Sequence, residues 1–457
     1  MGFTMKKSSA KAILSATVLL PLAAAGCGQN APSEANRASS PGASQTAVSS
    51  SGVTLSRSNE GETITFLTSG TPWMTPLIEK IPEFEKLTGI TVDVQQMVDT
   101  QLSNKVSVSA STGGHDLDLI YYRPLQEALL FIKNNWLEDL SGYIQQDPDF
   151  HYEDFFQAGR DITSKDGKVY GIPTMSERTM FFYNTEMFKD AGLSGTPKTY
   201  EELEEYAKKL HDPDNNRYAF AVRGEGNSAV TQFAAFLRGF GGDFIKDGKA
   251  AINTPEAIKA FEFYGKLVRE YSAPGAISNI WSDSLALFTQ GRAAMYIDGD
   301  VHYAETEDPE SSVVAGKVGF GPFPAGPAGS TPSSIIPWAI GISSGSKHKE
   351  ASWEFIRWAT SKGVDLELEL QGNSSARDST WKNPKAEAVF PSGMVEVIKA
   401  SGASGNPIDR PYLISGGEAR SIVAQVLTAA IAGKKELQPI ADDANARLQT
   451  LVDKEKQ

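Results

Sequence analysis

The chain has 457 residues, enough for about three domain-sized units, and its 43 Lys and Arg against 56 Asp and Glu give a formal net charge of −13. This acidic balance excludes a nucleic-acid partner, because binding to a phosphate backbone depends on clustered cations. The single cysteine excludes a disulfide framework and a multi-thiolate metal site, and there are only five histidines. With 40% hydrophobic and 22% charged residues, we expect a globular protein that uses no metal and no cofactor.

The first residues have the features of an export signal. Lys6 and Lys7 precede an apolar stretch, residues 12–25, that is too short to span a bilayer. The stretch runs through Ala-Ala-Gly into Cys27, a junction that resembles a bacterial lipoprotein signal, although Ala24 stands where leucine is usual. The resemblance implies that residues 1–27 are a signal peptide and that Cys27 is the lipid attachment site. The alternative is a plain secretory signal with an incidental cysteine.

A segment rich in serine and alanine follows, from residue 28 to residue 60. It has almost no large apolar side chains, so it cannot compensate the entropy of ordering by burying surface. We expect a flexible tether here and a folded body that begins near Gly61. No later run is long and apolar enough to cross a membrane, so we expect membrane contact through the lipid anchor only.

The folded body starts with alternating strands and helices. Residues 64–66 predict a first strand, and Leu77, Ile81 and Phe84 predict the buried face of a helix that Gly89 ends. Ile90, Val92, Val94, Gln96 and Val98 occupy every second position and predict another strand. The run 117–122, apolar apart from Asp118, is typical of a buried parallel strand. Strands separated by helices indicate a doubly wound α/β sheet.

The second part of the body continues this alternation. Residues 168–173 and 179–184 predict strands, Thr199 with Glu202 forms a capping box that opens a helix, and Thr254 before a proline opens another. The stretch 319–327 is rich in glycine and proline and predicts a segment that crosses between lobes. These patterns favour two α/β lobes.

Six short segments together resemble the family-1 extracellular solute-binding proteins of bacterial ABC importers. The segments occur in the order of that family and cover nearly the whole body: 83–92, 118–120, 170–173, 182–184, 287–295 and 349–356. The resemblance implies the type II periplasmic-binding-protein fold, in which two doubly wound lobes are joined by three crossing segments around a ligand cleft. It further implies an extracytoplasmic protein that captures a sugar or polyol by hinge closure and delivers it to permease subunits. We expect a monomer.

The resemblance also suggests where the lobes meet. It places the crossing segments near 175–178, 320–323 and 371–376. Lobe one would then comprise residues 61–176 with 322–372, and lobe two residues 177–321 with 373–457.

Aromatic residues on strand-to-helix loops are candidate ligand platforms, because ligands of open α/β sheets bind at the carboxyl ends of the strands. Trp73 follows the first strand, Trp281 precedes a helix that starts near Asp283, and Tyr122 stands where the family has a pocket aromatic. Trp338 lies where sugar-binding relatives usually carry glycines. Ordinary core packing is the alternative for each of these aromatic residues.

Polar candidates for hydroxyl binding come from the same kind of loop. Glu177 matches a hydroxyl-binding carboxylate of the maltose-binding branch, with pairing to Arg178 or to another cation at the lobe edge as the alternative. Arg377 resembles a family Pro-x-Arg pattern without its proline, with a surface charge as the alternative. The remaining candidates are Asp298 and Asp300, which follow a strand, and Asn227 and Gln232, which belong to a glycine-rich helix start.

Three motifs point elsewhere, and we interpret each as a coincidence. Residues 224–229 match a dinucleotide-binding pattern but lead into a polar turn instead of a parallel strand. Residues 341–345 match a hydrolase nucleophile pattern, but His348 is too close in sequence to serve as its base. Residues 212–223 begin like a calcium loop, but Arg217 and Arg223 replace its essential glycine and glutamate. No catalytic residue is assigned.

Two other functions stay open at the level of sequence. A protein of the same fold could bind another ligand, such as an anion, iron or a polyamine, and for a polyamine Glu177, Asp298 and Asp300 would be the acidic contacts. A secreted glycosidase needs only two suitably spaced carboxylates, which the 56 acidic residues cannot exclude. We predict a binding protein rather than an enzyme.

Overall fold

The computed structural model describes residues 46–49, 52–71, 73–112, 116–335 and 337–455. The predicted signal peptide and Cys27 lie outside these residues. Within the described part of the chain, none of the helices combines the length and the apolar character needed to cross a bilayer.

The predicted tether is wrong from Thr46 onward, because this stretch belongs to the folded body. β1 (Thr46–Val48) and β2 (Thr54–Ser56) form an antiparallel pair. Leu55 is fully buried in the same core as the helices of the first lobe, and the Ser56 N–H donates to the Glu354 carboxylate. One well-placed leucine anchors a segment whose composition alone predicts disorder.

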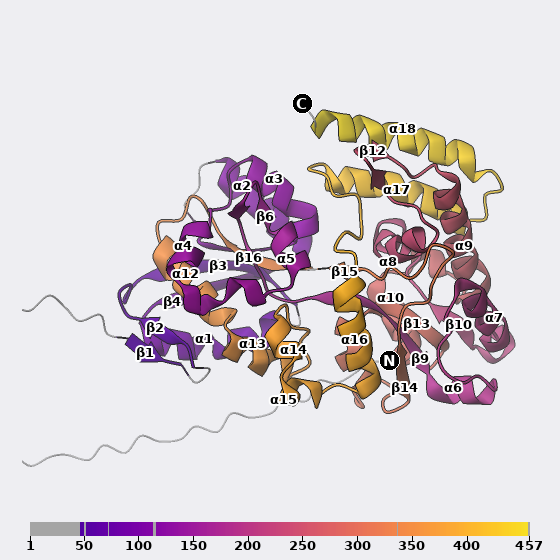
Figure 1. The fold of residues 1–457 in the computed structure, drawn as a ribbon, viewed down its shortest axis with the longest axis horizontal. Coiled ribbons are helices and arrows are strands. Elements are labelled where there is room, and N and C mark those ends of the chain that lie inside the picture. The colour runs from indigo at the N-terminus through magenta and orange to yellow at the C-terminus, as the bar shows by residue number, and fades with distance from the viewer. Residues whose placement is uncertain (1–45, 50–51, 72, 113–115, 336, 456–457) are drawn as a thin grey trace, which may run out of the picture. The chain divides into compact units, whose positions relative to one another are not determined.

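The first lobe is built on a five-stranded sheet, seen on the left of Figure 1. Its strand order is β4 (Thr91–Met97), β3 (Thr63–Ser69), β5 (Leu119–Tyr122), β16 (Ala339–Ile342) and β8 (Ile172–Pro173). β3 runs parallel to β4 and β5, whereas β16 runs antiparallel to its neighbours. The two predicted strand positions at 64–66 and 90–98 are therefore confirmed as β3 and β4.

Helices cover both faces of this sheet. α1 (Met74–Thr88) and α12 (Lys349–Ala359) pack on one face, where Phe84 meets Phe355 at a ring separation of 5.2 Å. α1 ends at Gly89 with φ of 73°, as the sequence predicts. The other helices of this lobe are α2 (Asp99–Ser111), α3 (Leu129–Lys133), α4 (Ser141–Gln146), α5 (Gln157–Ile162) and α13 (Lys362–Glu369).

The second lobe is built on a separate sheet. Its strand order is β10 (Tyr218–Ala221), β13 (Ala293–Gly299), β9 (Glu177–Asn184) and β14 (Val318–Gly321), and β15 (Ser334–Ile335) pairs with the start of β9. Only β10 and β13 are parallel within it. The short hairpins β6 (Ser164–Lys165) with β7 (Lys168–Val169) and β11 (Ile245–Lys246) with β12 (Lys249–Ala250) decorate the two lobes.

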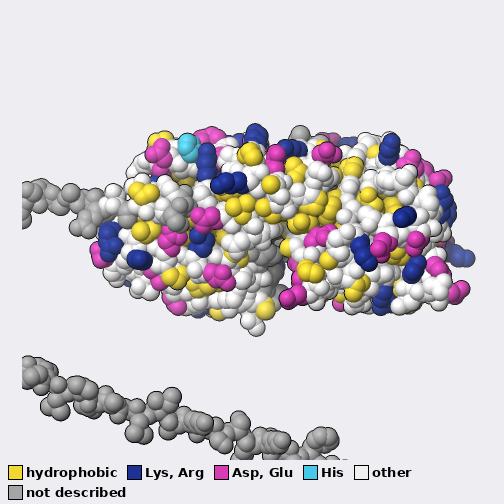
Figure 2. Space-filling view, turned by 90° about the horizontal axis from the view of Figure 1, so that it is seen from below, with side chains coloured by type: hydrophobic (Ala, Val, Ile, Leu, Met, Phe, Trp, Pro, Cys, Tyr) yellow, Lys and Arg dark blue, Asp and Glu magenta, His cyan; other side chains and the backbone are white. Residues whose placement is uncertain are grey.

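A large helical layer surrounds the second sheet. The predicted caps are confirmed: Thr199 and Thr254 accept backbone N–H groups of Glu202 and Ala257. The long helices are α7 (Tyr200–Leu210), α8 (Gly226–Gly239), α9 (Pro255–Tyr271), α10 (Trp281–Thr289), α16 (Ser392–Ser404), α17 (Gly416–Ile431) and α18 (Leu437–Glu455). The short ones are α6 (Thr185–Asp190), α11 (Tyr303–Glu307), α14 (Asp378–Trp381) and α15 (Pro384–Glu387). Figure 2 shows acidic and basic side chains interspersed over one face of the body, with hydrophobic side chains gathered near its middle.

The chain passes between the two sheets three times, which confirms the predicted fold class. The first and third passages lie side by side, because Met175 pairs with Ser375 and the Ser176 N–H donates to the Ser374 carbonyl over 3.0 Å. The second passage comes later than predicted. Phe320 belongs to β14, and the chain stays with the second lobe until Ile335 in β15. The outer limits of the two lobes stay predictions.

The guanidinium of Arg178 ties the first and third passages together. It donates to Ser176 Oγ over 2.7 Å and to Ser374 Oγ over 3.0 Å, and it forms a buried ion pair of 2.7 Å with Asp300. The ring of Trp381 lies 4.9 Å from this guanidinium. The charge is therefore neutralised and enclosed at the point where the lobes join.

Candidate ligand-binding cleft

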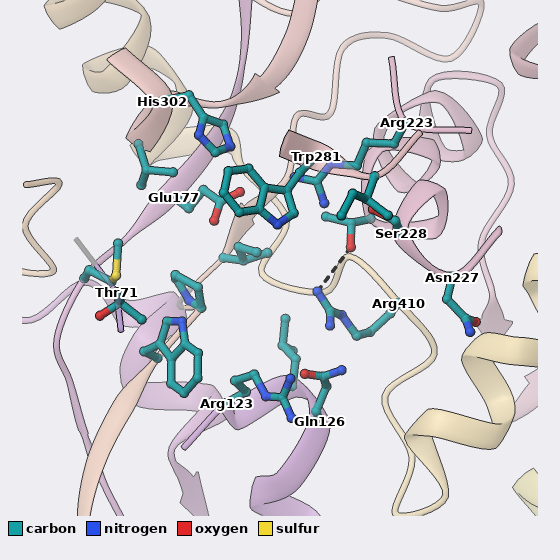
Figure 3. A pocket seen from close by; sticks show the side chains of 18 of the residues that line it. Thr71, Arg123, Gln126, Glu177, Arg223, Asn227, Ser228, Trp281, His302 and Arg410 are labelled. Atoms are coloured by element: carbon teal, nitrogen blue, oxygen red, sulfur yellow. Dashed lines mark hydrogen bonds between the residues drawn. The ribbon is translucent and has the colours of Figure 1, made fainter. Parts of the chain in front are cut away.

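A cavity of about 740 Å³ lies between the two lobes, with walls from both (Figure 3). It opens where strands end: Gly70 follows β3, Arg123 follows β5 and Val301 follows β13. This is the edge of the sheets at which the sequence analysis places the ligand. Its further lining residues are Thr71, Leu125, Gln126, Met175, Glu177, Arg223, Asn227, Ser228, Thr231, Ile280, Trp281, His302, Glu305, Ile335, Pro337, Trp338, Arg410 and Arg420.

Three stacked rings support the wall that the first lobe contributes. Trp338 lines the cavity and stacks on Tyr121 with a centroid distance of 4.7 Å and an interplanar angle of 8°. Tyr121 in turn stacks on Trp73 at 5.6 Å and 15°. Trp73 is fully buried two layers behind the surface, so its predicted place on the cavity wall is wrong. Its role is to hold the ring behind Trp338.

Tyr122 points away from the cavity, contrary to the prediction. It packs against Phe131 on the opposite face of the first sheet, and its hydroxyl lies 3.4 Å from the Tyr170 carbonyl. Successive residues of a strand alternate between faces, so Tyr121 takes the cleft side and Tyr122 the far side. The four residues of β5 are all large and apolar or aromatic, so they carry no signal for choosing between the two tyrosines.

Trp281 supplies an aromatic surface from the second lobe. It is the first residue of α10, is 44% exposed, and stacks on His302 at 5.3 Å and 12° (Figure 3). Burial opposes the charge of His302, but the carboxylates of Glu305 and Asp298 raise its pKa above the ordinary value. One face of the indole therefore rests on the imidazole of His302, and the exposed remainder of Trp281 is left for the cavity.

Glu177 lies at the start of β9 with its carboxylate in the cavity wall. The alternative of a pair with Arg178 is wrong, because Arg178 is bound to Asp300. Burial raises the pKa of Glu177 to about 7, although the charge of Arg223 opposes the shift. A Cβ on Gly299 would lie 2.4 Å from Glu177 Oε1, so only a glycine at this position leaves room for the carboxylate.

Asp298 and Gln232 do not line this cavity but hold Arg223 in its wall. The Asp298 carboxylate accepts from Arg223 Nε over 2.9 Å and from Gln232 Nε2 over 3.1 Å. Gln232 Oε1 accepts from the Arg223 N–H and from the Tyr264 hydroxyl, both at 2.9 Å. Burial would raise the pKa of Asp298, but Arg223 keeps it below its ordinary value. Both side chains are engaged in holding Arg223, so their prediction as ligand-contacting residues of this cavity is wrong.

Asp300 and Arg377 are also far from their predicted role. Asp300 is committed to Arg178, as described above. Arg377 is completely buried within the first lobe, where it donates to the carbonyls of Thr360 over 2.7 Å and Phe150 over 3.1 Å. Its guanidinium also lies 3.9 Å from the Phe155 ring. Neither the clamp nor the surface charge considered for Arg377 is correct.

The N-terminus of α8 contributes Asn227 and Ser228 to the cavity, and the predicted place of Asn227 in the cleft agrees with this. Thr231, one turn further, accepts from Arg410 Nη2 over 3.2 Å and from Arg420 Nη2 over 2.8 Å. Together with Arg123 and Arg223, these arginines were missed in the sequence analysis. Arg123 could have been found, since it comes directly after the predicted strand 117–122, and Arg223 directly precedes the glycine-rich motif 224–229. Arg410 and Arg420 lie in a region without a motif.

The described residues include no cluster of three or more His, Cys, Asp or Glu side chains arranged to hold a metal ion. The cavity instead combines two aromatic surfaces with hydroxyl, amide, carboxylate and guanidinium groups. Such a set stacks on the apolar face of a small polyhydroxylated ligand while hydrogen bonding to its hydroxyls.

Comparisons with known proteins agree with this geometry. Residues 68–365 match the family model described as bacterial extracellular solute-binding protein. A mannitol-binding protein of Pseudomonas aeruginosa is 29% identical over 292 residues, which are 63% of this chain and 66% of that protein. An erythritol/L-threitol-binding protein of Mycolicibacterium smegmatis is 26% identical, over 73% of this chain and 72% of its own length.

Solved structures are similar over a larger part of the chain. An ABC transporter solute-binding protein of Agrobacterium radiobacter K84 in complex with ribitol superposes with a TM-score of 0.77 at 28% identity, over 86% of this chain and 99% of that one. A solute-binding protein of Agrobacterium vitis S4 with bound D-mannitol gives 0.72 at 27% identity, over 87% and 98%. The chain therefore belongs to the family of bacterial extracellular solute-binding proteins.

Proposed function

We propose that this protein captures a sugar or polyol in the cleft between its lobes and delivers it to the permease of an ABC importer. The observation that carries the proposal is the pair of tryptophans, Trp338 from lobe one and Trp281 from lobe two, on the wall of one cavity. A carbohydrate offers a CH-rich face to each indole and hydroxyls to the polar groups between them.

The relatives support the substrate class. Proteins named for mannitol and for erythritol or L-threitol, and structures solved with ribitol and D-mannitol, all concern linear polyols of four to six carbons. The cavity of about 740 Å³ has ample room for a molecule of this size. A linear polyol is therefore the first ligand class to test.

Hinge closure follows from the way the walls are divided. A ligand that touches Trp338 and Trp281 together makes more contacts when the lobes are closed, so it shifts the population toward the closed state. The paired crossing segments at 174–176 and 373–377 give this movement a fixed axis. The permease then recognises the closed arrangement.

We further propose that a lipid on Cys27 holds the monomeric protein at the outer face of the cell membrane. The Ala-Ala-Gly-Cys junction and its preceding apolar stretch support this. Cys27→Ser should release the protein from membranes and leave ligand affinity unchanged. If the variant still fractionates with membranes in cells that lack the transporter, the anchor is not Cys27.

The cleft favours capture over the two other functions considered. Four arginines but only two glutamates line it, which is unfavourable for a polycationic polyamine. A glycosidase would differ from a binding protein because it would return a hydrolysed sugar instead of the intact ligand. Isothermal titration calorimetry with D-mannitol, ribitol, erythritol, maltose and spermidine tests the proposal, with mass spectrometry of the recovered ligand.

We expect binding of at least one polyol or sugar and recovery of that compound intact. Trp281→Ala should weaken binding about fivefold or more, since a stacking contact contributes about 1 kcal/mol beyond burial, and Trp281→Phe should restore part of it. Binding of spermidine alone, or hydrolysis of maltose, would contradict the proposal.

A further inference from the structure

The charges of the cleft are unevenly distributed between its two ends. Glu177 and Glu305 lie near His302 at one end, whereas Arg410 and Arg420 both donate to Thr231 near the start of α8. A neutral polyol needs hydrogen-bonding groups, but it does not need two adjacent guanidinium groups. Repulsion between two neighbouring positive charges destabilises the ligand-free protein, and binding of an anion would relieve it.

Most arginines of the cleft have an acidic partner. Arg123 pairs with Glu127 at 2.6 Å, Arg223 pairs with Asp298, and Arg410 donates to both carboxylate oxygens of Asp409 at 2.5 and 2.6 Å. These three guanidinium groups are therefore largely neutralised by the protein itself.

Arg420 differs from them. Its Nη2 donates to Thr231 Oγ1, its Nε is buried and has no hydrogen-bond partner, and no carboxylate of the described residues forms an ion pair with it. Burial and the neighbouring charge of Arg410 lower the pKa of Arg420 to about 9, so it still carries its charge at neutral pH. The wall of the ligand cavity therefore holds a guanidinium that forms no ion pair within the described part of the chain.

Two carboxylates near Arg420, those of Asp409 and Glu225, favour its charge, but both are already bound to other groups. Asp409 is already bound by Arg410, and the Glu225 carboxylate accepts from the Ser228 N–H over 2.8 Å as the cap of α8. Neither acid lines the cavity, whereas Arg410, Arg420 and Asn227 do. The positive end of the 14-residue helix α8 points to the same place and adds to its preference for an anion.

From this arrangement we infer that the ligand is an acidic carbohydrate, a polyol or sugar bearing one carboxylate or phosphate group, whose anionic end lies against Arg420 and Arg410. The inference rests on the proposed function, since it names the substrate class of the same cleft. The hydroxylated part of the ligand then extends toward Trp281 and Glu177, where its neutral hydroxyls can donate hydrogen bonds to the nearby carboxylates.

Matched ligands that differ only in their charge test this inference. Calorimetry compares D-mannitol with D-mannonate and D-mannitol 1-phosphate, and ribitol with D-ribonate and ribitol 5-phosphate. We expect one acidic member to bind at least about tenfold more tightly than its neutral parent, because a hydrogen bond to a charged group contributes more than a neutral one. The carboxylate and phosphate arms tell the two sources of negative charge apart.

Three variants locate the effect. Arg420→Gln should reduce the acidic-to-neutral preference to about one while changing the affinity for the neutral compound only a few-fold. Arg420→Lys should retain part of the preference. The matched control is Arg447→Gln on α18, where the arginine side chain is 47% exposed and 3.7 Å from Asp443, outside the cavity; it should change neither affinity.

A measurement on the unaltered protein guards against misfolding of the variants. Between about 0.02 and about 0.3 M NaCl, the affinity for the acidic ligand should fall, whereas that for the neutral parent should stay constant. If the neutral compounds bind as tightly as the acidic ones, the inference is wrong and the proposed function stands. If none of these compounds binds but erythritol or maltose does, the inference is likewise wrong and the proposed function stands. If erythritol and maltose also fail to bind, both are overturned.

Discussion

The side chains around the cleft divide into those that face the cavity and those that hold them there. Trp338, Trp281 and Glu177 face it, whereas Trp73 and Asp298 stand one or two layers behind. This division explains why residue types that look equally suited to ligand binding in the sequence have different consequences when replaced.

Glu177 should make the stability of the ligand-free protein depend on pH. Its pKa is raised by burial to about 7, above the unfolded value of about 4.3, so unfolding releases a proton between these values and stability falls as the pH rises through this window. Glu177→Gln removes this penalty. Thermal unfolding should give the variant a higher melting temperature than the wild type at pH 8 and a similar one at pH 4. An equal difference at both pH values would contradict the assignment of the shift to Glu177.

Arg377 should behave as a structural residue. Arg377→Met leaves the carbonyls of Thr360 and Phe150 without their buried donor and removes the arginine from Asp154, which keeps its hydrogen bonds from Ser379. We expect a cost of about 3–5 kcal/mol in the free energy of unfolding. Urea denaturation measures the loss, and ligand affinity below the transition should be unchanged. The exposed Arg447→Met should stay within about 0.5 kcal/mol of the wild type. A large loss of ligand affinity in a fully folded Arg377→Met protein would contradict this structural role and support Arg377 as a ligand-binding residue.

Among the elements, helix ends and strand positions are predictable from sequence because local chemistry determines them. Thr254, followed by a proline, starts α9, and Gly89, which follows the periodic apolar face of α1, ends that helix. When every side chain of a strand is apolar or aromatic, the elements packed against the strand determine which face points to the cleft. For this reason the sequence predicts Tyr122 as the cleft aromatic, whereas Tyr121 takes that side in the structure. The same limit applies to Arg410 and Arg420, whose place in the cleft depends on how α8 and α17 pack.

The buried ion pair between Arg178 and Asp300 lies where the crossing segments meet, so the free energy of unfolding should depend strongly on the charge of Asp300. Asp300→Asn keeps the shape of the side chain but leaves the buried guanidinium of Arg178 without its counter-ion, which should cost about 3–5 kcal/mol in the free energy of unfolding. Replacing both residues by Leu and Met should cost clearly less than the two single changes together, since no lone charge is left behind. Additive losses in urea denaturation would show that the pair does not act as a unit.

At the scale of the whole molecule, two lobes share one cavity, and the first and third crossing segments lie together on one side of it. The resemblance in sequence predicted this architecture. Each of the six short segments is weak evidence for the family by itself, but their occurrence in the family's order is strong evidence for its fold. Composition could not predict that the body begins at β1, nor that the second crossing follows β15. Both depend on a few long-range contacts, such as that of Leu55, rather than on a composition or a motif.

Small-angle X-ray scattering with and without ligand tests most directly the claim that one ligand bridges both lobes. The wild type, saturated with whichever of D-mannitol, ribitol or their acidic counterparts binds, should contract on binding. Trp281→Ala, saturated with the same compound, should contract less, because a ligand held mainly by one lobe has little preference for the closed state. Equal contraction of both proteins would remove Trp281 from the account, and no contraction of the wild type would contradict ligand capture by closure of the cleft.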